Sequence, residues 1–218
     1  MLSVVIPALS AGATLGACLE ALAGNNELIV VDGGSTDDTA EVAVRAGARV
    51  IAAPKGRGTQ LRAGVVAARG EWLLFLHADT RLAAGWREAV ADHVSAHGQK
   101  AACFRFRLDD PSWQARLLER VVALRVRWLG LPYGDQGLLI SRALYEAVGG
   151  YCALPLMEDV DLVRRIGRRR LRVLDVAAVT SANRWRRDGW LRRSALNLSC
   201  LLLWTIGISP ARIARLYG

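Results

Sequence analysis

The chain has 218 residues, of which 52% are hydrophobic and 22% charged, a composition typical of a folded globular protein and not of a disordered one. A chain of this length can bury roughly 70% of the surface that its unfolded form exposes, so its core needs no disulfide or structural metal. The four cysteines are isolated, which argues against a zinc ribbon, a thioredoxin-type dithiol and a disulfide scaffold. We therefore expect one domain, residues 1–218, in the reducing cytoplasm.

The beginning of the chain and its longest apolar segment bear on export and on membranes. Residues 1–7 lack the basic head and the long apolar middle of a signal peptide and are typical of a buried strand that ends at proline. The longest apolar candidate, residues 195–208, is shorter than the roughly 20 residues needed to cross a bilayer. We expect a protein that is not exported and does not span a membrane, with this segment either packed as core or lying on a membrane surface.

Positive charge is concentrated in the last quarter of the chain. Residues 1–161 carry 16 basic and 18 acidic side chains, whereas residues 162–218 carry 13 basic and 2 acidic ones. This asymmetry indicates an anionic partner, and the candidates are a diphosphate, an anionic lipid surface and nucleic acid.

Short apolar runs alternate with helical segments in the first third of the chain. We predict strands over residues 2–7, 27–32, 49–52 and 72–76, with helices over residues 14–23, 37–46 and 59–68. This order predicts an α/β fold in which a mostly parallel sheet is flanked by helices on both faces. The carboxyl ends of such strands meet at one edge of the sheet, where ligands bind.

The pattern changes after residue 85. We predict a helix over residues 85–97, a half-exposed antiparallel strand over 102–108 and an Arg-studded amphipathic helix over 113–128. A loop at 130–135, a strand over 137–140 and a helix over 160–167 follow, and the chain ends in further helices. The second half is therefore expected to add an antiparallel portion to the same domain.

Polar segments follow two of the predicted strands. Asp32 begins a Gly-Gly-Ser-Thr-Asp turn, where an acid beside bare backbone suits contact with a base or ribose, although a capped turn is an equal alternative. His77 and Asp79 follow the strand over 72–76; they are placed to hold a divalent ion at a diphosphate, or Asp79 caps the next element. Gly56 and Gly58 form a lone GxG without a third glycine, which is weak evidence for a phosphate loop.

Three segments of the second half carry further candidate chemistry. Glu158, Asp159 and Asp161 open a predicted helix, and three acids exceed what helix capping needs, so one of them is a candidate general base. Residues 134–137 form either a turn or a hydrogen-bonding loop for a sugar. Residues 181–187 combine an indole with guanidinium groups, which suits a sugar or base and a phosphate; a solvated basic loop is the alternative.

Together these segments resemble the family-two glycosyltransferases of the GT-A fold, and the resemblance covers nearly the whole chain. Each motif is weak alone, but their shared order and approximate spacing are specific. The motifs from residue 131 to residue 136, with Gly149-Gly150-Tyr151 and Ser209-Pro210, are most similar to a small bacterial branch labelled arsenosugar-biosynthesis-type. The residues that carry the family resemblance are Ser3 to Pro7, Asp32 with its turn, His77-Ala78-Asp79, Gly134-Asp135-Gln136, Glu158-Asp159 and Ser181-x-x-Arg184-Trp185.

The resemblance implies a role for each of these residues. Asp32 would contact the nucleotide base, Asp79 would bind Mn²⁺ or Mg²⁺, and Asp159, with Glu158 beside it, would be the catalytic base. His77 stands where the family has an acid that contacts ribose, and Ser181 stands where processive members have Gln, so processive polymerisation is not implied. The implied nucleotide-sugar site comprises Pro7, Asp32, Gly33, His77, Ala78, Arg184 and Trp185, and the implied acceptor site comprises Gly134, Asp135 and Gln136.

These roles predict an inverting glycosyltransferase that uses a nucleotide-diphosphate sugar, with uracil as the expected base, and a divalent ion. Residues 1–100 would bind the donor, residues 101–193 would form the acceptor and catalytic half, and residues 194–218 would form an apolar helix and tail. We expect no nucleic acid and no obligate protein partner. The expected location is the cytoplasm, either free or attached to the inner membrane face, and a lipid-linked molecule is one candidate acceptor. The alternatives are a non-catalytic nucleotide-sugar or polyanion binder and a nucleotidyltransferase on a similar sheet.

Overall fold

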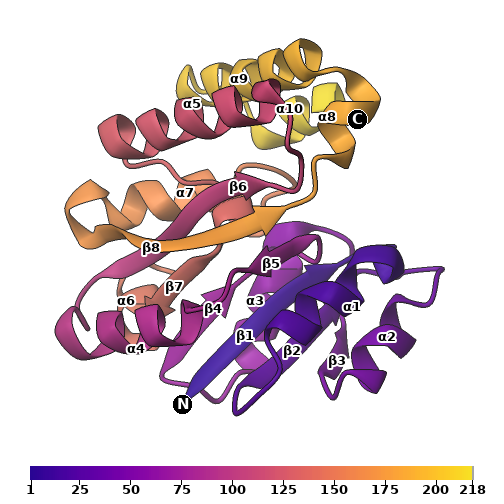
Figure 1. The fold of residues 1–218 in the computed structure, drawn as a ribbon, viewed down its shortest axis with the longest axis vertical. Helices are drawn as coiled ribbons and strands as arrows, with labels where there is room; N and C mark the ends of the chain where they lie inside the picture. Colours follow the sequence, from indigo (N-terminus) through magenta and orange to yellow (C-terminus); the bar gives the residue numbers. More distant parts are fainter. Residues whose placement is uncertain (218) are drawn as a thin grey trace.

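The computed structural model describes residues 1–217. At its centre is one eight-stranded sheet with the strand order β3-β2-β1-β4-β7-β6-β8-β5 (Figure 1). The sheet has helices on both faces, as the alternation of strands and helices predicts. The expected α/β architecture is confirmed.

The first half of the chain forms the parallel part of the sheet. Consecutive Val, Ile and Leu residues make β1 and its neighbour β2 apolar on both faces, as strands covered by helices on both sides require. The strands of this part are β1 (Leu2–Ala8), β2 (Glu27–Asp32), β3 (Arg49–Ala52) and β4 (Trp72–Phe75), and the helices are α1 (Gly12–Ala21), α2 (Thr39–Arg45) and α3 (Arg57–Ala67).

The second half adds strands of mixed direction. β7 (Leu138–Ser141) runs antiparallel to β4, and β6 (Ala101–Leu108) runs antiparallel to β7, so the antiparallel prediction for β6 is confirmed at this pairing. The other neighbour of β6 is β8 (Leu171–Thr180), and that pairing is parallel. The remaining elements of this part are β5 (Thr80–Leu82), α4 (Trp86–Ala96), α5 (Trp113–Leu129), the 3₁₀ turns η1 (Gly134–Gln136) and η2 (Arg168–Arg170), α6 (Arg142–Ala147) and α7 (Glu158–Ile166).

The alternation of side chains along β1 divides the core into two layers. Val4 and Ile6 pack with Leu15 of α1 on one face, whereas Val5 packs with Leu61 of α3 on the other. All of these side chains are buried, and full burial of each stabilises the fold by about 1.5–3 kcal/mol. The two layers hold the carboxyl ends of the parallel strands at one edge of the sheet.

Three helices end the described chain: α8 (Asn183–Asp188), α9 (Trp190–Thr205) and α10 (Pro210–Tyr217). The basic segment at residues 181–187 thus forms a short helix in place of the solvated loop considered above. One side of α9 is core, because Cys200 and Leu201 pack in a cluster with Val160 of α7 and Ile213 of α10. Among the described helices, none combines the length and the apolar character that crossing a bilayer requires.

Candidate active site

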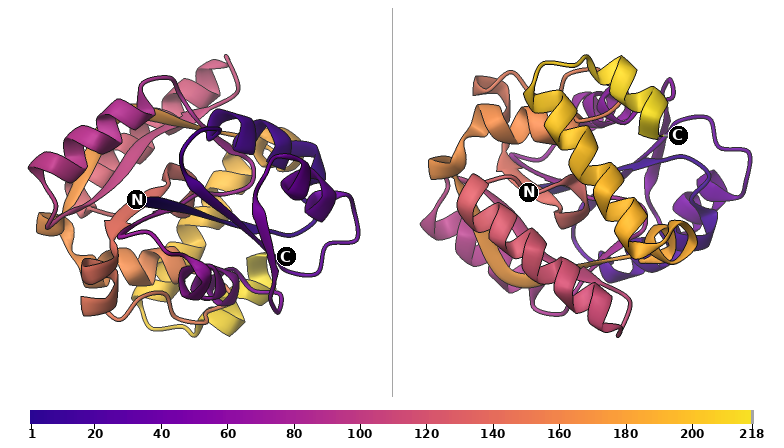
Figure 2. Two further views of the ribbon diagram at one scale, coloured as in Figure 1. Left: turned by 90° about the horizontal axis from the view of Figure 1, so that it is seen from below. Right: turned by 90° about the horizontal axis from the view of Figure 1, so that it is seen from above.

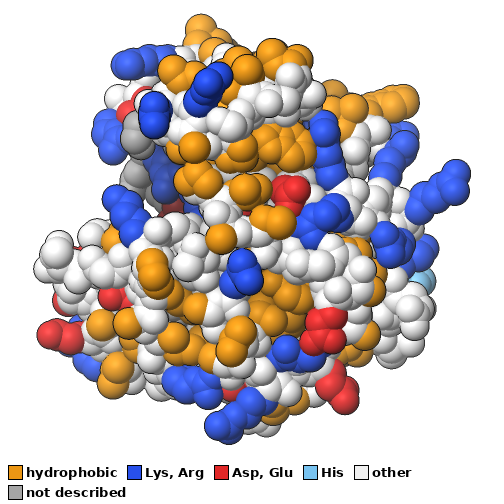
Figure 3. Space-filling view, turned by 180° about the vertical axis from the view of Figure 1, so that it is seen from behind, with side chains coloured by type: hydrophobic (Ala, Val, Ile, Leu, Met, Phe, Trp, Pro, Cys, Tyr) orange, Lys and Arg blue, Asp and Glu red, His pale blue; other side chains and the backbone are white. Residues whose placement is uncertain are grey.

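A cleft of about 1040 Å³ lies at the carboxyl edge of the parallel strands. The β1–α1 loop, the start of α3 and the His77–Asp79 turn line one wall, and α8, α9 and α10 line the other. Figure 3 shows a hollow between the upper and lower parts of the molecule with Lys and Arg side chains at its rim. A smaller cavity of about 90 Å³ adjoins the cleft, and Arg57, His77, Asp79 and Arg184 line both.

Asp79 is held where the parallel and mixed parts of the sheet meet. Its backbone carbonyl accepts a hydrogen bond from the Ser181 N–H at 3.2 Å, and its Oδ1 lies 3.5 Å from the hydroxyls of Thr80 and Thr180. These contacts fix the turn after β4 against the end of β8, so the Asp79 carboxylate lies at the wall shared by the cleft and the cavity.

Asp159 lies across this cavity, at the start of α7. Its Oδ2 accepts a hydrogen bond from the Gly134 N–H at 2.7 Å, and its Oδ1 accepts one from the Val160 N–H at 2.7 Å. A Cβ atom added at Gly134 would lie 2.4 Å from Nε2 of His77, so His77, Gly134 and Asp159 are in close contact. The fold therefore brings His77 and Asp159, which lie 82 positions apart in the sequence, close together in space.

Burial controls the charge of the groups around Asp159. Burial, reinforced by the charge of Arg57, lowers the pKa of His77 to about 3, so its imidazole is neutral near pH 7. Burial also raises the pKa of Asp135 to about 6, with a smaller contribution from the charges of Asp159 and Asp79. One carboxylate oxygen of Asp135 is buried without a hydrogen-bond partner.

Glu158 is buried behind the site and does not line the cleft or the cavity. Its Oε1 lies 3.6 Å from Nη1 of Arg57, and burial raises the pKa of its carboxyl to about 7 despite that cation. Because Arg57 lines the cleft, Glu158 is placed to orient this guanidinium and not to touch a ligand.

The residues implied by the family resemblance fall into two groups. Pro7, Ala78 and Arg184 line the cleft, and Gly134 and Asp135 line the smaller cavity. Asp32 and Gly33 line neither: the Asp32 carboxylate accepts a hydrogen bond from the Ser35 N–H at 3.1 Å, which is the capped turn, and Gly33 lies against Gln60.

Two residues that the family resemblance assigns to the site, Gln136 and Trp185, are largely buried. Gln136 donates from Nε2 to the Phe104 carbonyl at 3.0 Å, so its amide holds η1 against β6. Trp185 packs in an apolar cluster with Phe106, with ring centroids 6.4 Å apart. Trp185 still lines the smaller cavity, and its Nε1 has no hydrogen-bond partner.

The cleft and the smaller cavity also contain residues that the sequence analysis did not single out. Lys55 precedes α3 and Arg57 begins it, and both line the cleft. Arg193 of α9 lines both spaces, whereas Asn197 of α9 and Thr180 at the end of β8 line the smaller cavity. The Gly56-Arg57-Gly58 sequence was the available signal for the first pair. Gly58 is required there because a Cβ atom would lie 2.2 Å from the Cys152 carbonyl oxygen.

The side chains fit a divalent cation only together with a ligand. Within residues 1–217, no group of three or more His, Cys, Asp or Glu side chains is arranged to hold a metal ion. Asp79 offers a carboxylate at the cleft wall, and oxygen ligands are what Mg²⁺ and Mn²⁺ prefer. An ion here would need further oxygens from a bound molecule such as a diphosphate.

Comparison with known proteins supports this architecture. The sequence profile described as "Glycosyl transferase family 2" matches residues 3–154. The chain is 42% identical, over 93 residues, to the PGL/p-HBAD biosynthesis glycosyltransferase of Mycobacterium tuberculosis, a match that covers 38% of this chain and 36% of that protein. The match thus spans about a third of the length of this curated relative.

Solved structures of similar fold include the two that follow. Glucosyl-3-phosphoglycerate synthase from M. tuberculosis, in complex with Mn²⁺, UDP and glucosyl-3-phosphoglycerate, has a TM-score of 0.56 at 23% identity and covers 81% of this chain and 70% of that one. S. aureus TarS 1–349 in complex with UDP-GlcNAc has a TM-score of 0.67 at 15% identity and covers 99% and 70%. At these identities the likeness establishes the fold alone.

Proposed function

The chain belongs to glycosyl transferase family 2 and is a glycosyltransferase of the GT-A fold, and we propose that it transfers a sugar from a UDP-linked donor to an acceptor hydroxyl with inversion. The observation that carries this proposal is the meeting of Asp79, Asp159 and His77 around Gly134, at the carboxyl edge of the sheet.

Cationic side chains line the cleft and suit the diphosphate of the donor. Guanidinium groups pair with phosphate oxygens through charge-assisted hydrogen bonds. The cationic residues that line the cleft include Lys55, Arg57, Arg184, Arg187 and Arg192. The related solved structures that hold UDP support the choice of nucleotide. Pro7 and Ala78 would lie along the nucleotide. Asp32, with Gly33 beside it, would contact the base beyond the cleft lining, through carboxylate lone pairs that Ser35 leaves free.

We assign Asp79 as the protein ligand of Mn²⁺ or Mg²⁺, with His77 beside it at the position implied to contact ribose. The structural neighbour with Mn²⁺ and UDP supports this assignment. When bound, the ion would neutralise the negative charge of the departing diphosphate. Arg57 and Arg184 line both the cleft and the smaller cavity, as Asp79 does, so the protein contributes to this neutralisation directly.

Asp159 is the proposed general base. It would accept the proton of the acceptor hydroxyl as the oxygen forms a bond to the anomeric carbon and the bond from that carbon to the diphosphate breaks. The hydrogen bond from the Gly134 N–H fixes the orientation of the Asp159 carboxylate before the reaction. Glu158 would act by positioning Arg57, and Asp135 and Trp185 would line the acceptor subsite.

We further propose a location on the cytoplasmic membrane face and a lipid-linked or otherwise apolar acceptor. The basic character of residues 162–218 and the partly exposed α9 support this location. The motifs at residues 131–136, 149–151 and 209–210 support placement in the branch labelled arsenosugar-biosynthesis-type, a label that does not identify the substrate.

A thermal-shift screen of UDP-, GDP- and TDP-sugars, each with and without Mn²⁺, tests the donor. A ligand present at 100 times its Kd stabilises the folded protein by about 2.7 kcal/mol, so we expect a UDP-sugar with Mn²⁺ to raise Tm clearly above either component alone. Equal Tm values in all mixtures would contradict the proposal. Release of pyrophosphate in place of UDP would favour the nucleotidyltransferase alternative.

A further inference from the structure

Helix α5 presents an apolar stripe to solvent. Five large hydrophobic residues recur on it at intervals of three and four, and all are between 51% and 70% exposed. At 3.6 residues per turn these positions fall within roughly 80° of the helix circumference. On the opposite side of α5, Ala115, Val122 and Val126 are buried in an apolar cluster. The helix is therefore packed on the protein by that side, and the stripe is its outer side. Its members are Trp113, Leu117, Val121, Leu124 and Trp128.

Helix α9 presents a second stripe of the same kind. Leu191, Leu198, Leu202 and Ile206 are between 56% and 88% exposed and also fall within roughly 80° of arc, whereas Cys200 and Leu201 on the other side are core. Scattered exposed hydrophobic residues are normal on a protein surface, but two aligned stripes are not.

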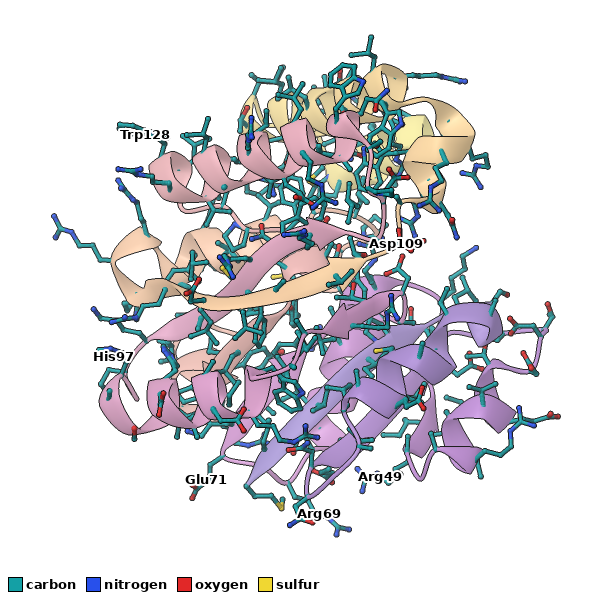
Figure 4. The ribbon with its side chains drawn as sticks, viewed as in Figure 1. Arg49, Arg69, Glu71, His97, Asp109 and Trp128 are labelled. Atoms are coloured by element: carbon teal, nitrogen blue, oxygen red, sulfur yellow. The ribbon has the colours of Figure 1, made fainter. Side chains whose placement is uncertain are left out.

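The two helices lie on the same side of the molecule. Figures 1 and 2 show α5 and α9 beside one another at the top of the fold, and Trp128 in Figure 4 points away from the body of the protein. A cluster under α5, which includes Trp185 of α8 and contacts Trp190 of α9, links the two helices. We call the combined exposed residues of the two stripes the apolar platform.

The charges around the apolar platform discriminate among possible occupants. Helix α5 carries four arginines and one glutamate, and the segment from α8 to α10 carries seven arginines and one aspartate. Arg120, Arg127 and Arg192 are exposed at positions close to the stripes. A second copy of this chain would bring arginines against arginines, which repel, whereas an anionic lipid surface pairs with them.

We propose that the apolar platform is the surface by which the protein docks on an anionic lipid bilayer, with α5 and α9 lying in the interface plane. Amphipathic helices with Trp and Leu on one face and Arg on the flanks bind in this way, and tryptophan favours the headgroup level. Because Arg192 and Leu196 of α9 line the donor cleft, docking would place the cleft beside the bilayer. This inference rests on the membrane location in the proposed function, and it assigns that location to a surface in which α5 contributes as much as α9.

Co-sedimentation with vesicles of phosphatidylcholine and anionic phosphatidylglycerol tests the docking without donor or acceptor. We expect the native chain to sediment at low salt and less at high salt. The triple variant Leu117→Ser, Val121→Ser, Leu124→Ser should bind at least about tenfold more weakly, because its apolar stripe is interrupted. Val44→Ser with Val66→Ser, two exposed hydrophobic positions outside the platform, should bind like the native chain.

A second readout identifies the contact itself. Vesicles of brominated lipid should quench the tryptophan fluorescence of the native chain, and Trp113→Phe with Trp128→Phe should keep vesicle binding but lose most of the quenching. The docking proposal is overturned if the native chain stays in the supernatant at low salt, if the triple and control variants bind equally, or if sedimentation equilibrium shows a dimer for the native chain and a monomer for the triple variant. Donor-induced thermal shifts on the same variants report the sugar transferase site separately, so either proposal can fail alone.

Discussion

The Asp159 carboxylate accepts a hydrogen bond from the backbone N–H of Gly134 at 2.7 Å and thereby ties the start of α7 to η1. There is no room for a side chain between them and His77, since a Cβ at Gly134 would lie 2.4 Å from the His77 ring and 3.4 Å from Asp159 Oδ2. The orientation of the proposed base therefore depends on a residue that has no side chain.

Gly134→Ala should disturb this contact. The added methyl group must displace His77, so we expect kcat to fall about tenfold or more, with a loss of about 1–3 kcal/mol in the free energy of unfolding. Gly98→Ala is the matched control, because the nearest atom to its new Cβ would be 3.5 Å away. Steady-state kinetics and urea unfolding on both variants check this, and equal kcat values for the two would contradict it.

Asp79→Ala should remove the part of donor binding that depends on Mn²⁺. The carboxylate is the expected protein ligand of the ion, so calorimetric titration with UDP should show tighter binding in Mn²⁺ than in EDTA for the native chain but not for Asp79→Ala. Asp175→Ala removes a surface carboxylate that pairs with Arg105 and should behave like the native chain. A native Kd that is the same with Mn²⁺ and with EDTA would refute the role of the metal.

Glu158→Gln should change how stability depends on pH. Burial raises the pKa of Glu158 from 4.5 to about 7, so the folded state holds this proton more tightly than the unfolded state. The free energy of unfolding should therefore fall as pH rises through about 4.5 to about 7, and Glu158→Gln should remove that contribution. Urea unfolding at pH 5 and pH 8 checks this: the native chain should lose more stability than the variant between the two values, and parallel losses would count against it.

Gln136→Leu separates a structural role from an acceptor contact. Its amide is buried and bonded to the Phe104 carbonyl, so the variant should lose about 1–3 kcal/mol in the free energy of unfolding while the Kd for donor is nearly unchanged. Gln99→Leu, at an exposed position, is the control and should be nearly neutral. If Gln136→Leu instead keeps its stability and loses kcat, the acceptor role implied by the family resemblance holds.

The sequence was most informative where the signal is local. The predicted strands at residues 27–32 and 49–52 have the observed bounds, because each is a short, largely apolar run between turn residues. The first is buried along most of its length, whereas the second is the partly exposed edge strand β3. β8 was not predicted, since Arg172, Asp175 and two alanines interrupt its alternation. It forms because β6 offers a parallel partner, with a register shift between Phe104 and Arg105 that no local pattern shows.

The same distinction between local and long-range features applies to the candidate site. The topology brings strand ends together, so His77 and Asp79 could be placed at the cleft from the sequence alone. The contact of Arg57 with Glu158 joins α3 to α7, and the burial of Gln136 depends on β6. Both features depend on residues far away in the sequence, so no local pattern predicts them. The type and order of residues therefore predict the location of a ligand site well. They predict less well which side chains of that site are accessible to the ligand.

The most direct test of the proposed transfer is the rate of UDP release from a UDP-sugar, identified by the thermal-shift screen, in the native chain, Asp159→Asn and Asp161→Asn. Asp161 lies on the same helix and pairs with Arg165, so it controls for charge removal near the site. The account predicts that Asp159→Asn lowers kcat by about 10² or more while the donor Kd is nearly unchanged, and that Asp161→Asn keeps most of the native rate. Native turnover in Asp159→Asn would contradict the central claim that this carboxylate is the base.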